Sequence, residues 1–226
     1  MCKLTNEQML RYFIFKDCGF DEEIAKKSYD FVMGNEPEPQ PESKPTTELA
    51  DGIYLMYGKT AVPYTGYEIP KDGKEGCTGI GVKFGGKSLV LALTDISDYD
   101  VKLTTQQGST RFITDYHRAA EDMDGKTATD DIRDILNMDI SDDEYIPSLG
   151  ELYFILAHFT RINAALEAVG GEPLCNAWYW SSTQHSATNA WYLYLNYGST
   201  GIGTKTAYQY RVRPVSAFFQ MNRHTK

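Results

Sequence analysis

The clearest periodic pattern in this chain begins at Ser148. Apolar side chains recur there at steps of three and four residues, which is the spacing of one face of a helix. Ser148 and Glu151 form a capping-box pattern, and Gly170-Gly171 ends the run. The pattern therefore predicts one long helix that packs on the core through Leu152, Ile155, Leu156, Phe159, Ile162, Leu166 and Val169.

After Gly171 the period changes from that of a helix to that of strands. Trp178–Ser182 is one predicted strand, and Trp191–Tyr197 alternates along its length. Leu193 and Leu195 fall on one side of this second strand, while Tyr192, Tyr194 and Asn196 fall on the other. Such a strand has one buried face and one aromatic face open to a partner. A third strand is predicted over Tyr210–Phe218, with Pro214 marking an edge or a bulge.

The first part of the main domain also contains strand patterns. Ile53–Tyr57 is a predicted strand, and Gly79–Phe84 and Ser88–Thr94 form a predicted hairpin around Gly85-Gly86. A helix is expected between Ser109 and Met123, and a helical turn or two within Asp130–Met138. Strands, helices and a final sheet together predict an α+β fold with a long core helix and a C-terminal antiparallel sheet.

A proline-rich segment separates this domain from the start of the chain. Residues 1–33 show two short amphipathic helical patterns, which bury little alone and are expected to attach to the main domain, another subunit or a larger assembly. Residues 34–50 carry Pro37, Pro39, Pro41 and Pro45 among polar and acidic residues, the composition of a semi-rigid linker. We therefore expect a helical attachment or oligomerisation segment at 1–33, a linker at 34–50, a ligand-binding domain at 51–219 and a tail at 220–226.

Charge and composition exclude several functions. A net charge of −9 gives no positive footprint for general nucleic-acid binding. The sequence shows no secretory signal and no apolar run of about 20 residues, so neither export by that route nor membrane insertion is expected. Cys2, Cys18, Cys77 and Cys175 are too far apart to suggest a zinc site or a disulfide framework. We expect synthesis in the cytoplasm, followed by assembly into a virion (a phage tail) or a bacterial location, cytoplasm or surface, reached without a signal peptide.

The region from Cys175 to the end of the chain differs sharply from the rest. It contains no Asp or Glu, although the chain is acidic, and it holds all three tryptophans and six of the sixteen tyrosines. Tyr with small hydroxylic and amide residues is the composition of a recognition surface. The basic residues Lys205, Arg211, Arg213, Arg223 and Lys226 are expected to neutralise neighbours in the fold rather than to meet an anionic ligand.

Catalytic chemistry has little support in the sequence. Asp95, Asp115 and Asp122 are acidic candidates, but no His or nucleophile accompanies them at a telling spacing. We expect no catalytic residues, no metal site and no cofactor. His158 is expected to be a packing or surface residue, and Trp180 and Trp191 are expected to belong to the core.

Several short phrases together resemble a known family. These are Ala92-Leu93-Thr94-Asp95-Ile96, the P-S-L-G-E-L phrase at 147–152, Y-W-S-S-T at 179–183, Asn189-Ala190-Trp191 and Arg211-Val212-Arg213-Pro214-Val215. In this order they resemble C-type-lectin-fold domains of the formylglycine-generating-enzyme type, in particular the variable proteins of diversity-generating retroelements. The resemblance covers about residues 51–219.

The resemblance implies that a reverse transcriptase diversifies the C-terminal region by miscopying adenines. Asn codons then become other codons ending in a pyrimidine, which cannot encode Trp, Met, Gln, Glu or Lys. Lys205 and Gln209 would accordingly be fixed, and Trp180, Ser181, Ser182, Trp191 and 211–215 would be scaffold. A loop such as Gly198–Thr204 would vary freely. The implied ligand contacts are His185, Tyr192, Tyr194, Tyr197, Ser199, Thr200, Gly201, Ile202, Gly203, Thr204, Thr206, Ala207, Tyr208 and Tyr210.

The resemblance leads us to expect a non-catalytic protein that recognises a protein or glycan on a target cell surface, as a homo-oligomer or within a virion. One alternative is a constant structural or adhesin subunit of a phage or bacterium. A formylglycine-generating enzyme is disfavoured, because such enzymes use two neighbouring cysteines and the C-terminal region has only Cys175. Calcium-dependent sugar binding is disfavoured because the acid-free region supplies no carboxylate ligand.

Overall fold

The computed structural model describes residues 49–66 and 74–218. The chain divides into two units, residues 1–47 and 48–226, and every described residue belongs to the second. The expected helical segment at 1–33 and the tail at 220–226 lie outside the described residues, as does the expected linker up to residue 48.

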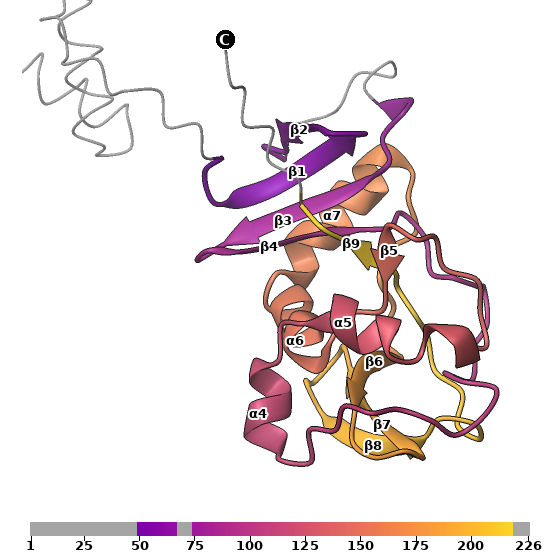
Figure 1. Cartoon of the computed structure of the whole chain (residues 1–226). Helices are drawn as coiled ribbons and strands as arrows, with labels where there is room; N and C mark the ends of the chain where they lie inside the picture. The colour runs from indigo at the N-terminus through magenta and orange to yellow at the C-terminus, as the bar shows by residue number, and fades with distance from the viewer. Residues whose placement is uncertain (1–48, 67–73, 219–226) are drawn as a thin grey trace, which may run out of the picture. The chain divides into compact units, whose positions relative to one another are not determined.

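The described residues form two antiparallel sheets (Figure 1). The larger sheet has the strand order β2-β1-β3-β4-β9-β5, with bounds Thr60–Pro63, Gly52–Tyr57, Gly79–Phe84, Lys87–Leu91, Val215–Ser216 and Glu144–Tyr145 in that order. The smaller sheet has the order β6-β7-β8, with bounds Trp178–Gln184, Asn189–Tyr194 and Thr200–Thr204. The α+β expectation is confirmed.

The hairpin predicted around Gly85-Gly86 is present. β3 and β4 pair antiparallel from Ile80 opposite Leu91 to Phe84 opposite Lys87. Gly85 and Gly86 both have positive φ angles, 58° and 78°. A two-residue turn with positive φ at both positions matches the twist of paired strands, and glycine adopts it without strain.

The long helix predicted after Ser148 is in fact two helices. α6 spans Leu149–Ala157 and α7 spans Phe159–Val169, and His158 between them has a non-helical backbone with φ −116° and ψ 13°. The predicted capping box is present at the start of α6. Gly170, in the left-handed conformation, ends α7.

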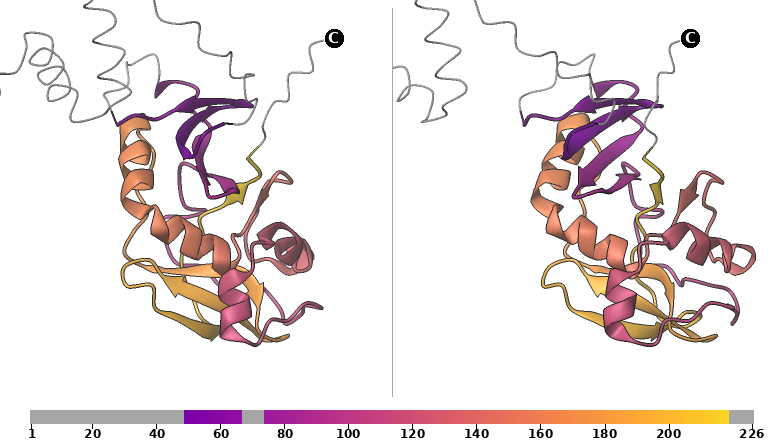
Figure 2. Two further views of the ribbon diagram at one scale, coloured as in Figure 1. Left: turned by 90° about the vertical axis from the view of Figure 1, so that its left-hand side faces the viewer. Right: turned by 60° about the vertical axis from the view of Figure 1, so that its left-hand side comes forward.

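The break at His158 lets each helix cover a different sheet (Figure 2). α7 contacts β1 and β3 of the larger sheet, and α6 contacts β6 and β7 of the smaller one. The His158 ring stacks on Phe84 at the end of β3, with 4.0 Å between ring centroids. His158 is thus a packing residue, as expected from the sequence.

Of the other helical predictions, the first was too long and the second is confirmed. The helix expected over Ser109–Met123 is only α4, Tyr116–Glu121, capped by the Asp115 carboxylate. Residues before it form a loop, because the Ser109 and Thr110 hydroxyls donate hydrogen bonds to the Asp131 carboxylate. α5 spans Gly125–Asp130, and the helical turn expected within Asp130–Met138 is the 3-10 turn η1, Arg133–Ile135.

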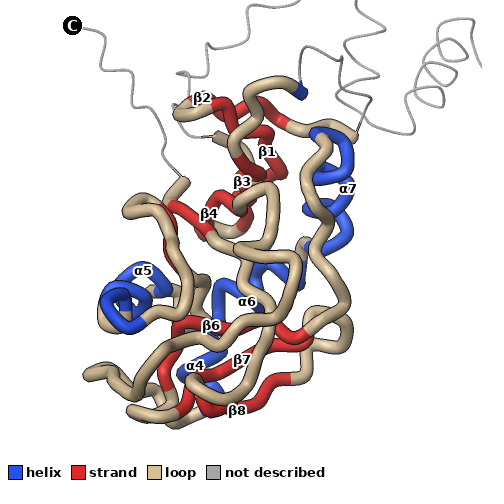
Figure 3. The backbone as a smooth tube through the Cα atoms, turned by 90° about the vertical axis from the view of Figure 1, so that its right-hand side faces the viewer, coloured by secondary structure: helices blue, strands red, loops and turns tan. Residues whose placement is uncertain are grey.

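The two largest buried clusters hold these layers together. The larger lies between the helices and the two sheets and includes Ile80, Leu152, Ile162 and Leu193. The second surrounds Trp180 on the other side of the smaller sheet, with Leu103, Ile146 and Val212. The smaller sheet therefore has core on both sides. Figure 3 shows its strands β6, β7 and β8 side by side.

Candidate ligand-binding face

The alternation predicted along the second C-terminal strand is confirmed. Leu193 and Leu195 are 0% and 1% exposed and belong to the cluster under α6. Tyr192 and Tyr194 are half-buried and lie on the opposite side of β7. The strand thus places leucines under the helix and tyrosines away from it.

Six aromatic side chains lie in one continuous row of ring contacts, which we call the aromatic face. Tyr197 contacts Tyr194 at 5.8 Å between centroids, and Tyr194 contacts Trp178 at 4.7 Å. Trp178 contacts Tyr192 at 4.9 Å, and Tyr192 contacts Tyr210 at 4.6 Å. The row ends at Tyr208, 6.1 Å from Tyr210. All five tyrosines among the implied ligand contacts belong to this row.

Exposure along the aromatic face is graded. Tyr197 and Tyr208 are 79% and 54% exposed, and Trp178 is 37% exposed. Tyr192, Tyr194 and Tyr210 are half-buried between them. Burial and the neighbouring Tyr192 raise the pKa of Tyr210. The ends of the row are therefore open to a partner, while its centre also supports the fold.

Trp180 is the buried base of the aromatic face. Its side chain is 0% exposed and contacts Tyr210 and Tyr192, with ring centroids at 4.6 Å and 6.2 Å. The indole Nε1 donates a hydrogen bond to the carbonyl of Val101, and Val101 pairs with Tyr210. The Trp180 ring thereby fixes the segment that carries Tyr210. Trp180 and Trp191 are core residues, as expected.

The turn between β7 and β8 positions Tyr197 at the end of the row. Gly198 has a φ of 69°, and its N–H donates to the carbonyl of Tyr194. The Tyr153 hydroxyl of α6 donates to the carbonyl of Gly198 at 3.1 Å. Tyr197 is thus exposed on a turn that is tied to a core helix.

The buried hydroxyls of the Y-W-S-S-T phrase tie β6 to its surroundings. Ser181 donates to the carbonyl of Trp191, and Ser182 donates to the carbonyl of Gly125. The Thr183 hydroxyl donates to Asp122 and accepts from the N–H of Leu149. These residues satisfy polar groups in the core, in agreement with their expected role as scaffold.

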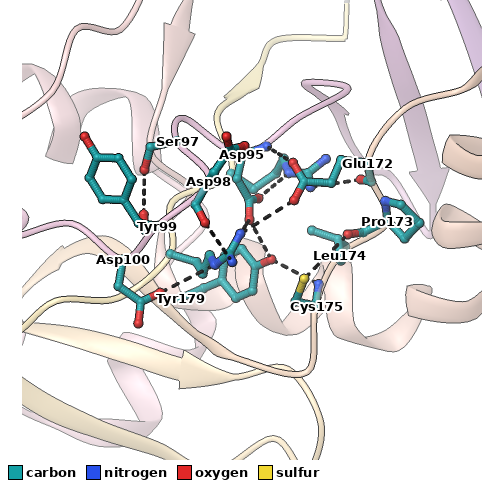
Figure 4. Close-up of polar contacts among 12 residues, drawn as sticks. Asp95, Ser97, Asp98, Tyr99, Asp100, Glu172, Pro173, Leu174, Cys175 and Tyr179 are labelled. Carbon is teal, nitrogen blue, oxygen red and sulfur yellow. Dashed lines mark hydrogen bonds and ion pairs between the residues drawn. The ribbon is translucent and has the colours of Figure 1, made fainter.

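The arginines near the aromatic face pair with acidic residues of the fold, and Figure 4 shows three of these, Asp95, Asp100 and Glu172. Arg213 Nε lies 2.6 Å from Asp95 Oδ1, and both side chains are fully buried. Arg211 Nη1 lies 3.1 Å from Asp95 Oδ2, and Arg211 also contacts Asp100 and Glu172. The expectation of internal ion pairing is confirmed for both arginines.

Lys205 is also buried, at 0% exposure. Its Nζ donates to the carbonyl of Gly108 and to Gln184 Oε1. Burial lowers the pKa of Lys205 to about 8, and the negative charge of Asp131 partly offsets this effect. Arg211 and Arg213 thus neutralise acidic neighbours as expected, whereas the hydrogen-bond partners of Lys205 are uncharged.

The predicted ligand contacts lie on two sides of the smaller sheet. Strand register places Gly201 opposite Tyr192 and Gly203 opposite Ala190, on the side of the aromatic face. Thr200, Ile202 and Thr204 alternate with them and lie on the other side. His185 contacts Trp191 from that other side, at 5.4 Å between centroids. Ser199, Thr206 and Ala207 lie in the turns on either side of β8.

Two expectations about β8 were wrong. The segment expected as a free loop at Gly198–Thr204 contains β8, which pairs with β7 along five positions. Gly203 is buried, and a Cβ there would lie 2.9 Å from the Trp180 ring. The Tyr192 ring lies against Gly201, and the Trp180 ring lies against Gly203, so the packing of these rings depends on small residues in β8.

Trp178 belongs to the face although the sequence patterns do not predict it. Those patterns place Trp178 at the start of a strand, and tryptophan codons cannot arise from diversified Asn codons. The pairing of β6 with β7 shows that Trp178 belongs to the face, because Trp178 lies opposite Tyr194 and Trp180 lies opposite Tyr192. Residues opposite each other in a ladder share one side of a sheet.

The acidic residues considered for catalysis have structural partners. Asp95 binds Arg213 and Arg211, Asp115 caps α4, and Asp122 accepts from Thr183. Within the described part of the chain, no group of three or more His, Cys, Asp or Glu side chains could hold a metal ion. No helix in residues 49–66 and 74–218 is long and apolar enough to cross a membrane.

The similarity of this chain to known proteins is structural. No family model and no curated protein matches this chain. A crystal structure of a fimbrial protein from Bacteroides ovatus superposes with a TM-score of 0.48 at 18% sequence identity. The match covers 74% of this chain and 48% of that one, so this chain spans about half the length of the fimbrial protein.

Proposed function

We propose that this chain is a non-catalytic recognition protein that binds a macromolecular ligand on a cell surface through the aromatic face. The observation that carries the proposal is the unbroken row of rings from Tyr197 to Tyr208, with both ends exposed. An exposed aromatic patch on a folded domain usually marks an interaction site. Tyr and Trp give large contact areas at low cost in side-chain entropy.

We further propose that residues 51–219 form a C-type-lectin-like domain. The resemblance implied a set of scaffold positions, and burial supports that assignment. Trp180, Ser181, Ser182, Trp191, Val212 and Arg213 are all buried. The helix capped by Ser148 and Glu151 lies under the sheet that carries the aromatic face.

On the same resemblance, we propose that the chain is a variable protein of a diversity-generating retroelement. Lys205, whose codon cannot arise from the diversified set, is fully buried. Tyr197 and Tyr208, whose codons can, are exposed. Sequencing the flanking DNA tests this directly. We expect a reverse transcriptase gene and a near-repeat of the C-terminal coding sequence with Asn codons at Tyr194, Tyr197 and Tyr208.

A constant adhesin or structural subunit is the second candidate. The same aromatic face would serve it, but the flanking DNA would lack a template repeat. A locus with no repeat would therefore reject the retroelement origin and leave the binding proposal in place.

Multivalent display is part of the proposal. Each well-buried large side chain contributes about 1.5–3 kcal/mol, and association costs remove much of the sum from a few anchors. Linking several copies would increase the apparent affinity by about 10²–10⁴. Residues 1–33 are proposed as the segment that joins copies to one another or to a virion. Light scattering on the full chain should give an oligomer, and a monomer both alone and in its native assembly would reject this part.

Binding to target cells tests the face itself. The variants Tyr197→Ala and Tyr208→Ala, alone and combined, should reduce the retention of labelled protein on cells that the parent binds. Tyr99→Ala is a matched control, because Tyr99 is 71% exposed and its ring makes no contact with the aromatic face. Equal retention of the parent and the double variant would reject the aromatic face as the binding site.

A further inference from the structure

The side chains around the aromatic face leave it without net charge. From Cys175 to the end of the described chain there is no Asp or Glu, and the basic residues are Lys205, Arg211 and Arg213. Lys205 and Arg213 are fully buried, and Arg211 is held by Asp95, Asp100 and Glu172. In a chain with a net charge of −9, the described residues from Cys175 onward thus present no exposed and unpaired acidic or basic side chain at this face.

The sheet positions on this side carry a narrow range of side chains. β6 contributes Trp178 and Trp180, β7 contributes Ala190, Tyr192 and Tyr194, and β8 contributes Gly201 and Gly203. None of these is a branched aliphatic side chain or methionine, and Ile202 lies on the other side of β8. Apart from Ala190 and the two glycines, every side chain at these sheet positions is aromatic, and none is charged.

Neutral hydrogen-bonding groups border the rings. Asn176, Asn196, Ser199 and Gln209 are exposed, and each lies within two residues of a member of the face. Together with the tyrosine hydroxyls they supply donors and acceptors without charge. Arg211 directly follows Tyr210 and contacts Asp100. The exposed residues Asp100 and Lys102 flank Val101, which pairs with Tyr210, and they carry opposite charges.

Ring geometry favours an elongated ligand whose units change orientation along its length. Trp178 is tilted by 37° from Tyr194 and by 86° from Tyr192, and Tyr192 is tilted by 57° from Tyr210. Rings at such angles do not form a flat platform. Successive sugar rings of a soluble polysaccharide likewise turn about the chain axis, and the C–H faces of a sugar ring pack on aromatic faces, which carry partial negative charge.

We propose that the ligand of the aromatic face is a neutral, soluble glycan chain, bound without a metal ion. Sugar C–H groups stack on Trp178, Tyr194 and the exposed rings at the two ends. Sugar hydroxyls bond to the bordering amides and hydroxyls. This inference rests on the proposed function, since it names the ligand class of the same face.

Trp178 provides a direct reporter for the test. It is the exposed tryptophan of the three, at 37%, against 0% for Trp180 and 8% for Trp191. The full chain is first applied to an array of neutral and charged glycans. Hits are then titrated in solution while tryptophan fluorescence is followed, with and without excess EDTA.

We expect the bound glycans to be neutral chains, and their hexasaccharides to change the Trp178 emission in a saturable way. The matching disaccharide should bind at least about tenfold more weakly, because it covers fewer rings. EDTA and added salt should leave binding unchanged. Tyr197→Ala or Tyr208→Ala should weaken binding about tenfold, while Tyr99→Ala should not change it.

Binding only to charged glycans, binding that EDTA abolishes, or binding that survives both face variants would overturn the proposal. An array without any hit would overturn it as well. If the protein binds no glycan while Tyr197→Ala and Tyr208→Ala still reduce its attachment to cells, the proposed ligand class is wrong and the aromatic face remains the binding site. In that case a protein ligand of the same cells takes its place.

Discussion

Gly201 lies directly opposite Tyr192 in the β7–β8 ladder, and the tyrosine ring crosses over it. A Cβ on Gly201 would lie 2.5 Å from Tyr192 Oη. Gly203, two residues on, lies beneath the Trp180 ring and the inner edge of Tyr192. An aromatic ring packed across a glycine of the neighbouring strand is a known device for fixing a side chain on a sheet. The two glycines therefore position the centre of the aromatic face.

Replacing these glycines by alanine should have unequal effects. Gly201→Ala meets the hydroxyl end of the half-buried Tyr192 ring. A small shift of that ring should limit the fall in the free energy of unfolding to about 1 kcal/mol or less. Gly203→Ala meets the buried Trp180 ring at 2.9 Å and should cost about 1–3 kcal/mol. Urea denaturation of the two variants measures the difference.

A double-mutant cycle identifies the cause of the Gly201 effect. In a Tyr192→Ala background the clash is gone, so Gly201→Ala should no longer destabilise the protein and a coupling energy should appear. Additive effects of the two changes would show that the glycine acts through backbone freedom instead of through the tyrosine ring.

The tyrosines of the aromatic face should differ in their contribution to stability. Tyr197→Ala and Tyr208→Ala should change the free energy of unfolding by about 0.5 kcal/mol or less, because these rings are mostly exposed. Tyr192→Ala should lower it by about 2 kcal/mol, since the ring contacts Trp178, Trp180 and Tyr210. Thermal and urea unfolding give the order. Equal losses for Tyr192 and Tyr197 would contradict the observed packing.

The buried pair of Asp95 and Arg213 should be among the most sensitive points of the fold. Arg213 also donates to the carbonyls of Ala92 and Glu172, so it joins three segments. Arg213→Met leaves the Asp95 carboxylate buried with less compensation and should cost about 3–5 kcal/mol. Urea unfolding measures this loss.

Arg211→Met provides the matched control for that change. Arg211 binds the same carboxylate, but its side chain is 20% exposed and its other acidic partners are partly exposed. Its loss should be clearly smaller than that of Arg213. A similar loss for both variants would mean that burial does not set the strength of this network.

The sequence predicts those elements that depend only on residues close together in the chain. The capping box at Ser148 and Glu151, the Gly85-Gly86 hairpin and the alternation of leucine and tyrosine in β7 all follow from the backbone geometry of a few neighbouring residues. The break at His158 does not, because the apolar period continues through it. It depends on two sheets that are far apart in sequence and on the Phe84 ring that stacks against His158.

Only part of the aromatic face can be predicted from the sequence, because only part of it depends on neighbouring residues in one strand. Tyr192 and Tyr194 follow from alternation within one strand, whereas Trp178 and Tyr210 join them through pairings between strands. The roles of Gly201 and Gly203 depend on which residue of β7 lies opposite each of them. Sequence alone placed both in a free loop, because two glycines among small hydroxylic residues are typical of loops.

Glu151 makes stability dependent on pH. Burial raises the pKa of Glu151 to about 7, although hydrogen bonds from the Ser148 N–H and from the Tyr145 and Ser148 hydroxyls lower it in part. Its ordinary value is 4.5, so between these two values the folded state binds more protons than the unfolded state. The contribution of this group to stability is therefore complete below pH 4.5 and is lost as the pH rises through 7.

Glu151→Gln removes this titration and retains the shape of the side chain, and the Tyr145 hydroxyl can turn to accept from the new amide. Between pH 4.5 and 7, the stability of the parent should fall relative to that of the variant by up to about 3 kcal/mol. Urea denaturation at a series of pH values gives the difference curve. Glu121→Gln, which changes an exposed carboxylate at the end of α4, should give a difference curve that is nearly flat. If the Glu151→Gln curve is equally flat, the carboxylate is ionised in the folded protein throughout this range, and its three donors outweigh its burial.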